Sequence, residues 1–146
     1  MQRLVINPEF SRVIATRFIN TPGSLWESVL GWKGLNTEDV QELAVSLPKS
    51  AHIIDKTTYS LPAETLAELL PKLRENEVYV AGVDTDICVS QISGELFDAG
   101  IAPWVLEDYT GSTAGYDHHK HGLRTLGRLV GRSRVVSWTK GSQLTK

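Results

Sequence analysis

The sequence predicts an α/β fold with a doubly wound, mostly parallel sheet and helices on both of its faces, in a three-layer α/β/α arrangement. Short β-branched runs alternate with helical patterns along the chain, and parallel strands need such crossovers between them. The 146 residues suit one domain, and no internal repeat, low-complexity tract or linker is present. Hydrophobic residues make up 41% and charged residues 22%, which is enough to bury a real core. We therefore expect a single domain over residues 1–146.

The strands are predicted from short apolar or β-branched runs that turn residues bound on either side. They cover residues 11–19, 52–56, 78–81, 103–108 and 134–138. Loops are predicted where glycine, proline and small polar residues gather. They cover residues 20–24, 31–36 and 109–115. The first ten residues are ambiguous, and a polar tail follows the last strand.

Three helices are predicted in the first half of the chain. A short one runs through residues 25–30, with a serine or threonine of the preceding loop as its cap. Thr37 is a predicted N-cap for a second one, which includes residues 40–44. The third begins at residues 61–62 and carries one leucine stripe, in which Pro71 predicts a kink or an early end.

Two further helices follow the strand at residues 78–81. The first of them begins at the sole cysteine, Cys88, and Gly100 fits its C-terminal cap. Its predicted buried side consists of Ile87, Val89, Ile92, Leu96 and Phe97. The last helix carries apolar residues between 123 and 130, and Gly131 closes it.

The net charge, the apolar runs and the cysteine count exclude several classes of function. The formal net charge is -2 and no block of lysine or arginine stands out, so we expect no nucleic-acid partner and no membrane partner. No apolar run approaches the roughly 18 residues that span a bilayer. Residues 1–10 lack a long apolar segment and a small-residue cleavage site, so we expect no signal peptide. A single cysteine suits a reducing, cytoplasmic compartment.

The most informative stretch is VYVAGVDTDICV, residues 78–89. It predicts a buried strand, a tight turn and a helix whose first turn holds Cys88. The first N–H groups of a helix have no partner within it, and its N-terminus carries about half a positive charge. We therefore predict a thiolate nucleophile where open α/β sheets place their sites, with backbone N–H groups beside it for an oxyanion. The alternative is a buried cysteine that acts as a small core residue.

Lys56 is the predicted partner of Cys88. It comes just past the end of a strand, and strand ends of a parallel sheet face the same edge. Its ammonium would stabilise a thiolate and a negatively charged intermediate. The alternative is a solvated lysine, since most lysines are exposed. Asp84 and Asp86 flank the turn, and one of them is expected to cap the Cys88 helix.

The histidines and tryptophans allow weaker inferences. His118 and His121 are three residues apart at the start of a helix and would share one face, with His119 between them. No second cluster of ligands lies at suitable spacing, so we expect a solvated polar face, no metal and no other cofactor. The tryptophans are expected in the core or an interface, and one near Gly31 would line a pocket.

These residues resemble the isochorismatase-like cysteine hydrolases, which include the nicotinamidases. Residues 82–89 resemble the family signature G-x-x-T-D-x-C-V around Cys88. Residues 16–24 look like the family's second strand and the loop after it. Residues 56–60 resemble its K-x-x-Y-S segment, and residues 107–112 look like the exit of its fifth strand. The resemblance runs from about residue 11 to the last strand, with the segments in the family's order.

The resemblance implies a Cys–Lys–Asp triad in which Cys88 is the nucleophile and Lys56 the second member. It also implies a cis peptide bond between Val83 and Asp84, which would turn the Asp84 N–H into an oxyanion hole with the Cys88 N–H. The implied reaction is attack on an amide, ureido or similar carbonyl carbon, followed by hydrolysis of a thioester. The expected pocket is small and partly apolar. It includes Trp32, Tyr59 and Tyr109.

Two departures from the family matter. Metal-containing members carry an Asp-x-His motif after the second strand, where this chain reads RFIN at residues 17–20, so no nicotinamidase metal is expected. The family's triad aspartate ends its first strand, and two alignments of that region are possible. Either residues 2–10 are the tail of helix 1 and the first strand is absent, or residues 4–7 are that strand with Asn7 at the aspartate position. We favour the first, because the second leaves too little chain for a right-handed crossover.

Both alignments lack the general base, since an amide cannot accept a proton as a carboxylate does. Loss of a triad base commonly lowers the rate by several powers of ten. The favoured alignment also leaves two strand edges unpaired, so we expect a homo-oligomer in which a neighbouring chain supplies a strand.

Two functions therefore stay open. The first is a hydrolase that cleaves a C–N or related bond of a small-molecule substrate through a Cys88 thioester, which the intact Cys88 turn favours. The second is a catalytically inactive relative that serves as a binding or assembly subunit, which the missing aspartate favours. A flavodoxin-like nucleotide binder would need a glycine-rich phosphate loop after a strand, which the sequence lacks.

Overall fold

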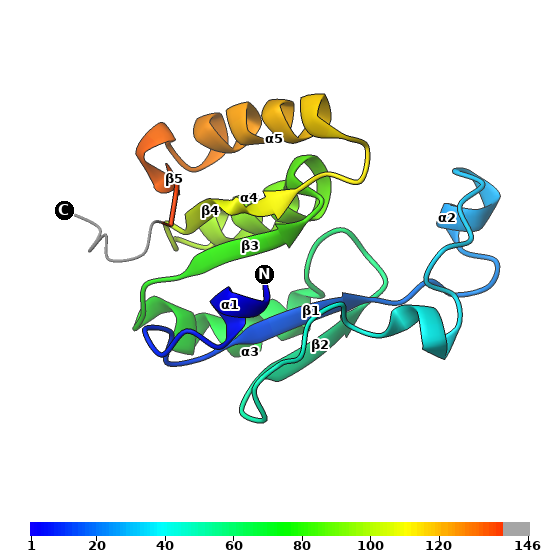
Figure 1. The fold of residues 1–146 in the computed structure, drawn as a ribbon, viewed down its shortest axis with the longest axis horizontal. Helices are drawn as coiled ribbons and strands as arrows, with labels where there is room; N and C mark the ends of the chain where they lie inside the picture. Colours follow the sequence, from blue (N-terminus) through cyan, green and yellow to red (C-terminus); the bar gives the residue numbers. More distant parts are fainter. Residues whose placement is uncertain (139–146) are drawn as a thin grey trace. The chain divides into compact units, whose positions relative to one another are not determined.

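The computed structural model describes residues 1–138, so the expected polar tail lies largely outside the described residues. Figure 1 shows strands and helices alternating along the chain, which forms two compact units, Met1–Thr58 and Tyr59–Lys146. Every strand pair is parallel, as the alternation of elements predicts. The parallel sheets with their connecting helices confirm the predicted α/β class.

The first unit contains a two-stranded parallel sheet, formed by β1 (Ile14–Phe18) and β2 (His52–Lys56). Arg17 and Asp55 face each other in this register, and the guanidinium donates two hydrogen bonds to the carboxylate, at 2.7 and 2.9 Å. The hydrogen bonds from Arg17 hold the pKa of Asp55 below its usual value. This bidentate pair therefore supports the parallel register near the carboxyl ends of both strands.

Two short helices accompany this sheet. Residues Gln2–Val5 form α1, which the Gln2 side chain ties to Ser46 through two hydrogen bonds of 2.8 Å. The alignment that treats residues 4–7 as a strand is therefore wrong. The second helix, α2 (Leu25–Ser28), begins at Ser24, whose hydroxyl accepts a backbone hydrogen bond at 3.3 Å as a predicted cap does.

The prediction of a helix after Thr37 is wrong, because this segment forms no more than a single turn. Only a 3₁₀ turn, η1 (Glu38–Gln41), forms there. The Gln41 side chain donates a hydrogen bond to the Leu35 carbonyl at 2.9 Å, and Val40 is exposed. A turn whose apolar face is not packed against other elements does not extend into a longer helix, because most helix stability comes from tertiary packing.

The second unit contains a three-stranded parallel sheet in the order β3-β4-β5. Its elements are α3 (Ala63–Arg74), β3 (Tyr79–Val83), η2 (Thr85–Val89), α4 (Ser90–Asp98), β4 (Trp104–Gly111), α5 (Tyr116–Leu129), η3 (Arg132–Arg134) and β5 (Val135–Val136). The crossovers that connect these strands are α4 and α5, which pack against each other, and α5 also contacts β4 and β5 (Figure 1).

The core of this unit joins the sheet, α5 and the end of η2. It consists of the buried residues Val89, Val105, Leu126 and Val130, against which Val80, Leu123 and Val135 pack. Val89 follows Cys88 directly, so burial of Val89 anchors the turn that carries the cysteine.

Two predicted details of the helices in this unit differ in the structure. The early end predicted as one outcome at Pro71 is wrong, since α3 continues to Arg74 with Pro71 inside it, and the kink predicted as the other outcome stays a prediction. Pro71 and Ala67 are both exposed, so water can satisfy the carbonyl that loses its hydrogen bond to the proline. Phe97 is exposed and not part of the buried side of α4, because Leu96 takes the buried position at that level of the helix.

The two last strands differ from their predicted lengths. β4 extends to Gly111, because Thr110 and Gly111 pair with Gly82 and Val83 of β3. The first residues of the loop predicted at 109–115 therefore belong to a strand. β5 is shorter than predicted and pairs only through two residues with β4. Among the described residues, no helix has the length and apolar character needed to cross a bilayer.

Candidate active site

Cys88 lies in η2, a π-helical turn that connects the carboxyl end of β3 to α4. The Asp84 carbonyl accepts hydrogen bonds from the N–H groups of Ile87 at 3.1 Å and Val89 at 3.0 Å, and the second bond closes the wider π turn. The peptide bond between Val83 and Asp84 is cis, as the resemblance implied. Cys88 is partly buried and is not among the residues of the apolar core.

The strand before this turn ends irregularly. The pairing of β3 with β4 shifts register between Val80 and Gly82, and Gly82 has a φ of 130°. A residue with a Cβ atom rarely adopts that conformation. Glycine at this position therefore allows the backbone conformation with which β3 leads into the Cys88 turn, while the extra residues of the register shift lie in β4.

Thr85 is the first residue of η2 and is fully buried. Its hydroxyl lies 2.8 Å from Nδ1 of His119, and its carbonyl accepts a hydrogen bond of 2.7 Å from the Ser90 hydroxyl. Buried polar groups are stable only when they have such partners. The start of the cysteine turn is therefore fixed by hydrogen bonds to side chains from both α5 and α4.

Asp84 and Asp86 hold the loop that follows β4 and the start of α5. Asp84 accepts two hydrogen bonds from Thr113, one from its N–H at 2.7 Å and one from its hydroxyl at 2.8 Å. Asp86 lies 3.3 Å from the imidazole of His118. Burial raises the pKa of Asp86, but the nearby Ser112 hydroxyl, a backbone hydrogen bond and His118 together lower that pKa below its usual value.

The predicted helix-capping role of these two carboxylates is wrong. Asp84 takes the N-cap position of η2, yet its side chain makes no capping hydrogen bond there. Both carboxylates face residues from the β4–α5 connection, because the loop after β4 ends beside the turn. The solvated polar face predicted for the histidines is right for His118 and His121, which are exposed, whereas His119 is partly buried and bonds to Thr85. The described part of the chain contains no group of three metal-ligating side chains.

Helix α5 approaches the cysteine turn most closely at Gly122. A Cβ atom at this position would lie 2.7 Å from the Asp86 backbone nitrogen and 2.9 Å from the Thr85 carbonyl carbon. Real Cβ atoms do not approach backbone atoms that closely. Glycine in the middle of α5 therefore allows this helix to contact the backbone of the turn directly.

In the first unit, Lys56 ends β2 and is only 4% exposed. Its ammonium donates a hydrogen bond to the Thr58 carbonyl at 2.6 Å and lies 5.6 Å from the centre of the Phe18 ring. Phe18 pairs with Lys56 across β1 and β2 and also packs edge-on against Trp26 at 5.0 Å. The alternative of a solvated lysine is therefore wrong. A buried lysine is rare and needs partners such as these.

The loop after β1 is organised by Asn20, which is 2% exposed. Its amide donates to the carbonyls of Trp32 and Gly34, at 3.3 and 3.0 Å, and its Oδ1 accepts from the Ser24 hydroxyl at 2.7 Å. Asn20 ends the segment where metal-containing relatives carry Asp-x-His. Its donor and acceptor atoms are used to shape the loop, so the residues present do not fit that metal.

The predicted site residues divide between the two units. Cys88, Asp84, Asp86 and Tyr109 belong to the second unit, and so does the exposed Tyr59, whereas Lys56 and Trp32 belong to the first. Within the second unit, the structure brings Asp84, Asp86 and Cys88 into one turn. The triad role of Lys56 and the shared pocket remain predictions.

Four residues with a role at this turn were not predicted. They are Thr85, Thr113, His119 and Gly122. The sequence carried a signal for Gly122, because glycine inside a helical pattern is unfavourable unless packing requires it. The contacts of the adjacent histidines cannot be predicted from sequence, because their partners lie more than thirty residues away along the chain, as in the Thr85–His119 separation of 34 residues.

The parallel strands, their connecting helices and the cysteine turn at the carboxyl end of β3 define an α/β fold. Residues 9–135 match the model of the isochorismatase domain. The chain therefore belongs to the isochorismatase-like hydrolase family, as the resemblance predicted. No curated protein matches the chain.

Solved structures with the same fold agree with this assignment. An isochorismatase-like hydrolase from Alkaliphilus metalliredigens has a TM-score of 0.69 at 17% identity, over 82% of this chain and 66% of that one. A nicotinamidase from Bacillus subtilis has a TM-score of 0.70 at 24% identity, over 89% of this chain and 77% of that one. A pyrazinamidase of Pyrococcus horikoshii in complex with zinc has a TM-score of 0.67 at 24% identity, over 82% and 72%. This chain thus spans about two thirds to three quarters of the length of these proteins.

Proposed function

We propose that this protein is a cysteine hydrolase that cleaves an amide, ureido or similar C–N bond of a small molecule. The observation that carries the proposal is the partly buried Cys88 in a π-helical turn at the carboxyl end of a parallel strand. Such turns are frequent at functional sites, and the N-terminal end of a helix such as α4 stabilises negative charge on sulfur. The names nicotinamidase and pyrazinamidase among the similar structures support an amide as the substrate class.

In the proposed reaction, the Cys88 thiolate forms a C–S bond with the carbonyl carbon, and the carbonyl oxygen becomes an oxyanion. The N–H groups of Asp84 and Cys88 are the proposed donors to that oxyanion. The C–N bond then breaks, and the nitrogen leaves as ammonia or an amine after it receives a proton. Water hydrolyses the thioester, which releases the acid and restores the thiol.

The other proposed roles follow from burial and bonding. Lys56 is the proposed cation that stabilises the thiolate and the oxyanion, and its burial supports a role beyond solubility. Asp84 is not proposed as the proton acceptor, because Thr113 donates a hydrogen bond to each of its carboxylate oxygens. Trp32, Tyr59 and Tyr109 are the proposed lining of the substrate pocket.

The proposed nucleophile predicts rapid alkylation of Cys88. We expect native protein to react with iodoacetamide about tenfold faster than the same protein in denaturant at the same pH, because the proposed site holds Cys88 as a reactive nucleophile. Cys88 is the sole cysteine, so the mass increase of the protein reports on this residue alone. Equal rates in the native and denatured states would contradict an activated nucleophile.

The proposed role of Lys56 predicts a loss of reactivity when its charge is removed. In Lys56→Met, which keeps an apolar stem, we expect alkylation of Cys88 to slow about tenfold, because the proposed cation that stabilises the thiolate is gone. Lys33→Met is the matched control, because Lys33 is an exposed lysine of the same unit. A Lys56→Met protein that reacts like this control excludes Lys56 as the partner of the thiolate.

A further inference from the structure

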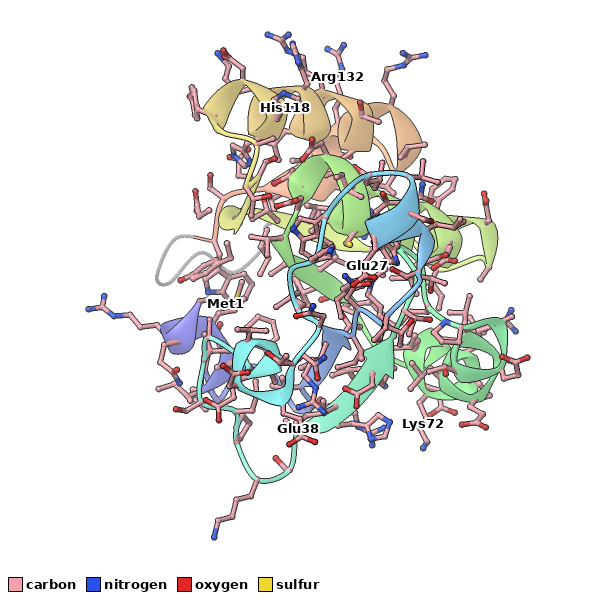
Figure 2. The ribbon with its side chains drawn as sticks, turned by 90° about the vertical axis from the view of Figure 1, so that its right-hand side faces the viewer. Met1, Glu27, Glu38, Lys72, His118 and Arg132 are labelled. Atoms are coloured by element: carbon pink, nitrogen blue, oxygen red, sulfur yellow. The ribbon has the colours of Figure 1, made fainter. Side chains whose placement is uncertain are left out.

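The turn that carries Cys88 is held from one side by α5 and the loop before it. Three successive residues of the turn are each bonded to a different residue of that segment. The pairs are Asp84 with Thr113, Thr85 with His119 and Asp86 with His118. We call Thr113, His118, His119 and Gly122 the α5 latch, since Gly122 adds direct contact with the turn backbone. Figure 2 labels His118 on α5.

The members of the latch differ in their exposure to water. The Asp84–Thr113 hydrogen bonds are exposed, and the His118 side chain is 61% exposed. By contrast, Thr85 is completely buried, and His119 is partly buried. Water competes with exposed hydrogen bonds, whereas a buried hydroxyl that loses its partner finds no replacement. The Thr85–His119 bond is therefore the latch contact on which the geometry of the turn depends most.

We infer that His119 is a positioning residue for the Cys88 nucleophile, acting through Thr85. Thr85 begins the π turn, and its carbonyl is fixed by Ser90, so its hydroxyl bond to His119 sets the orientation of this end of the turn. The turn contains the Cys88 N–H and follows the Asp84 N–H, which are the proposed oxyanion donors. This inference rests on the proposed function and assigns that site a residue outside the Cys–Lys–Asp set.

The chemistry of the pair indicates which substitutions should matter. A threonine hydroxyl can donate or accept, so it can bond with Nδ1 of His119 in either protonation state of the imidazole. Thr85→Val keeps the shape of the side chain but removes the hydroxyl, and His119→Phe keeps a ring but removes the nitrogen. Thr85→Ser retains the hydroxyl, and His119→Asn places an amide group where Nδ1 lies.

The test compares two reagents that react with the same sulfur. Acylation of Cys88 by p-nitrophenyl acetate passes through an oxyanion and needs the backbone donors, whereas alkylation by iodoacetamide displaces iodide and forms no oxyanion. We expect Thr85→Val and His119→Phe to slow acylation about tenfold to 100-fold while alkylation changes less than about threefold. The double variant should be no slower than the slower single variant, because both changes remove the same bond. Thr85→Ser and His119→Asn should acylate within about threefold of the unsubstituted protein.

The outcomes separate this inference from the proposed function. If the unsubstituted protein is acylated normally and all variants keep its rate, His119 is not a positioning residue, although the proposed function stands. The same conclusion follows if acylation and alkylation fall in parallel, as loss of folded protein would cause, or if the two single effects add in the double variant. If Cys88 of the unsubstituted protein is acylated no faster than in denaturant, the proposed function fails and this inference fails with it.

Discussion

Replacing Cys88 by alanine is expected to abolish hydrolysis of small amides, with kcat/KM at least about a thousandfold lower than that of the unsubstituted protein. The reason is that the proposed mechanism has a covalent step, and alanine has no atom that can form the thioester. The measurement is ammonia release from a panel of primary amides that includes nicotinamide and pyrazinamide, the substrates for which two similar structures are named. The panel should also contain ureido compounds, because the proposed substrate class covers both.

Cys88→Ala has to leave the fold intact for this result to be informative. Cys88 is partly buried, while its neighbour Val89 carries the contact with the core. We therefore expect the free energy of unfolding to change by less than about 1 kcal/mol. Cys88→Ser is the matched variant, since it keeps a nucleophilic atom of similar size, and weak residual hydrolysis by serine alone would support covalent catalysis. Hydrolysis that survives unchanged in Cys88→Ala would show that another group carries the reaction.

The strands of this protein could be predicted from sequence because each is a local apolar run between turn residues. All five predicted strands are present, and the differences lie at their ends. The end of β4 is the clearest case, since Thr110 and Gly111 have the composition of a loop but pair with β3. Between the pairs Val80–Val105 and Gly82–Thr110, β4 has more residues than β3, so the irregularity that makes this pairing possible lies in β4, and no local pattern reports it.

After Thr37 the sequence predicts a helix that the structure does not contain. Its capping residue and apolar spacing suit a helix, but the segment has no surface on which to bury that apolar face, so it stops after one 3₁₀ turn. The turn at Cys88 was located correctly, yet its π geometry was not foreseen. A hydrogen bond from residue i to i−5 differs from an α-helical bond by one residue, and hydrophobic spacing cannot distinguish the two over a single turn.

The candidate site was predictable where its residues are adjacent in sequence, and it was not where they meet through the fold. The positions of Cys88 and Asp84 follow from one motif, whereas the bond from Thr85 to His119 joins residues from different crossovers. The histidine pair illustrates the limit. The two histidines can be seen in the sequence, but only the packing of α5 against η2 shows that they contact the cysteine turn.

Gly122→Ala is expected to destabilise the protein by about 1–3 kcal/mol, although alanine is the better helix former by about 1 kcal/mol. The added Cβ would lie 2.7–2.9 Å from backbone atoms of Thr85 and Asp86. Backbone atoms cannot rotate away as a side chain does, so either α5 or the cysteine turn has to move. The measurement is the free energy of unfolding in urea, together with the rate at which p-nitrophenyl acetate acylates Cys88. We expect both quantities to fall, because the atoms that the methyl group displaces begin the turn that carries the nucleophile.

Gly94→Ala is the matched control for this prediction. Gly94 lies in the interior of α4, and a Cβ atom at that position would have no neighbour within 4 Å. Alanine there should gain about 0.5–1 kcal/mol of stability from helix propensity and leave the acylation of Cys88 unchanged. The expected changes in the free energy of unfolding have opposite signs in the two variants. The comparison therefore separates the contact with the turn from the general effect of glycine in a helix. If Gly122→Ala stabilised the protein as much as Gly94→Ala, the close contact between α5 and the backbone of the cysteine turn would be excluded. Gly122 would then have no role in the α5 latch.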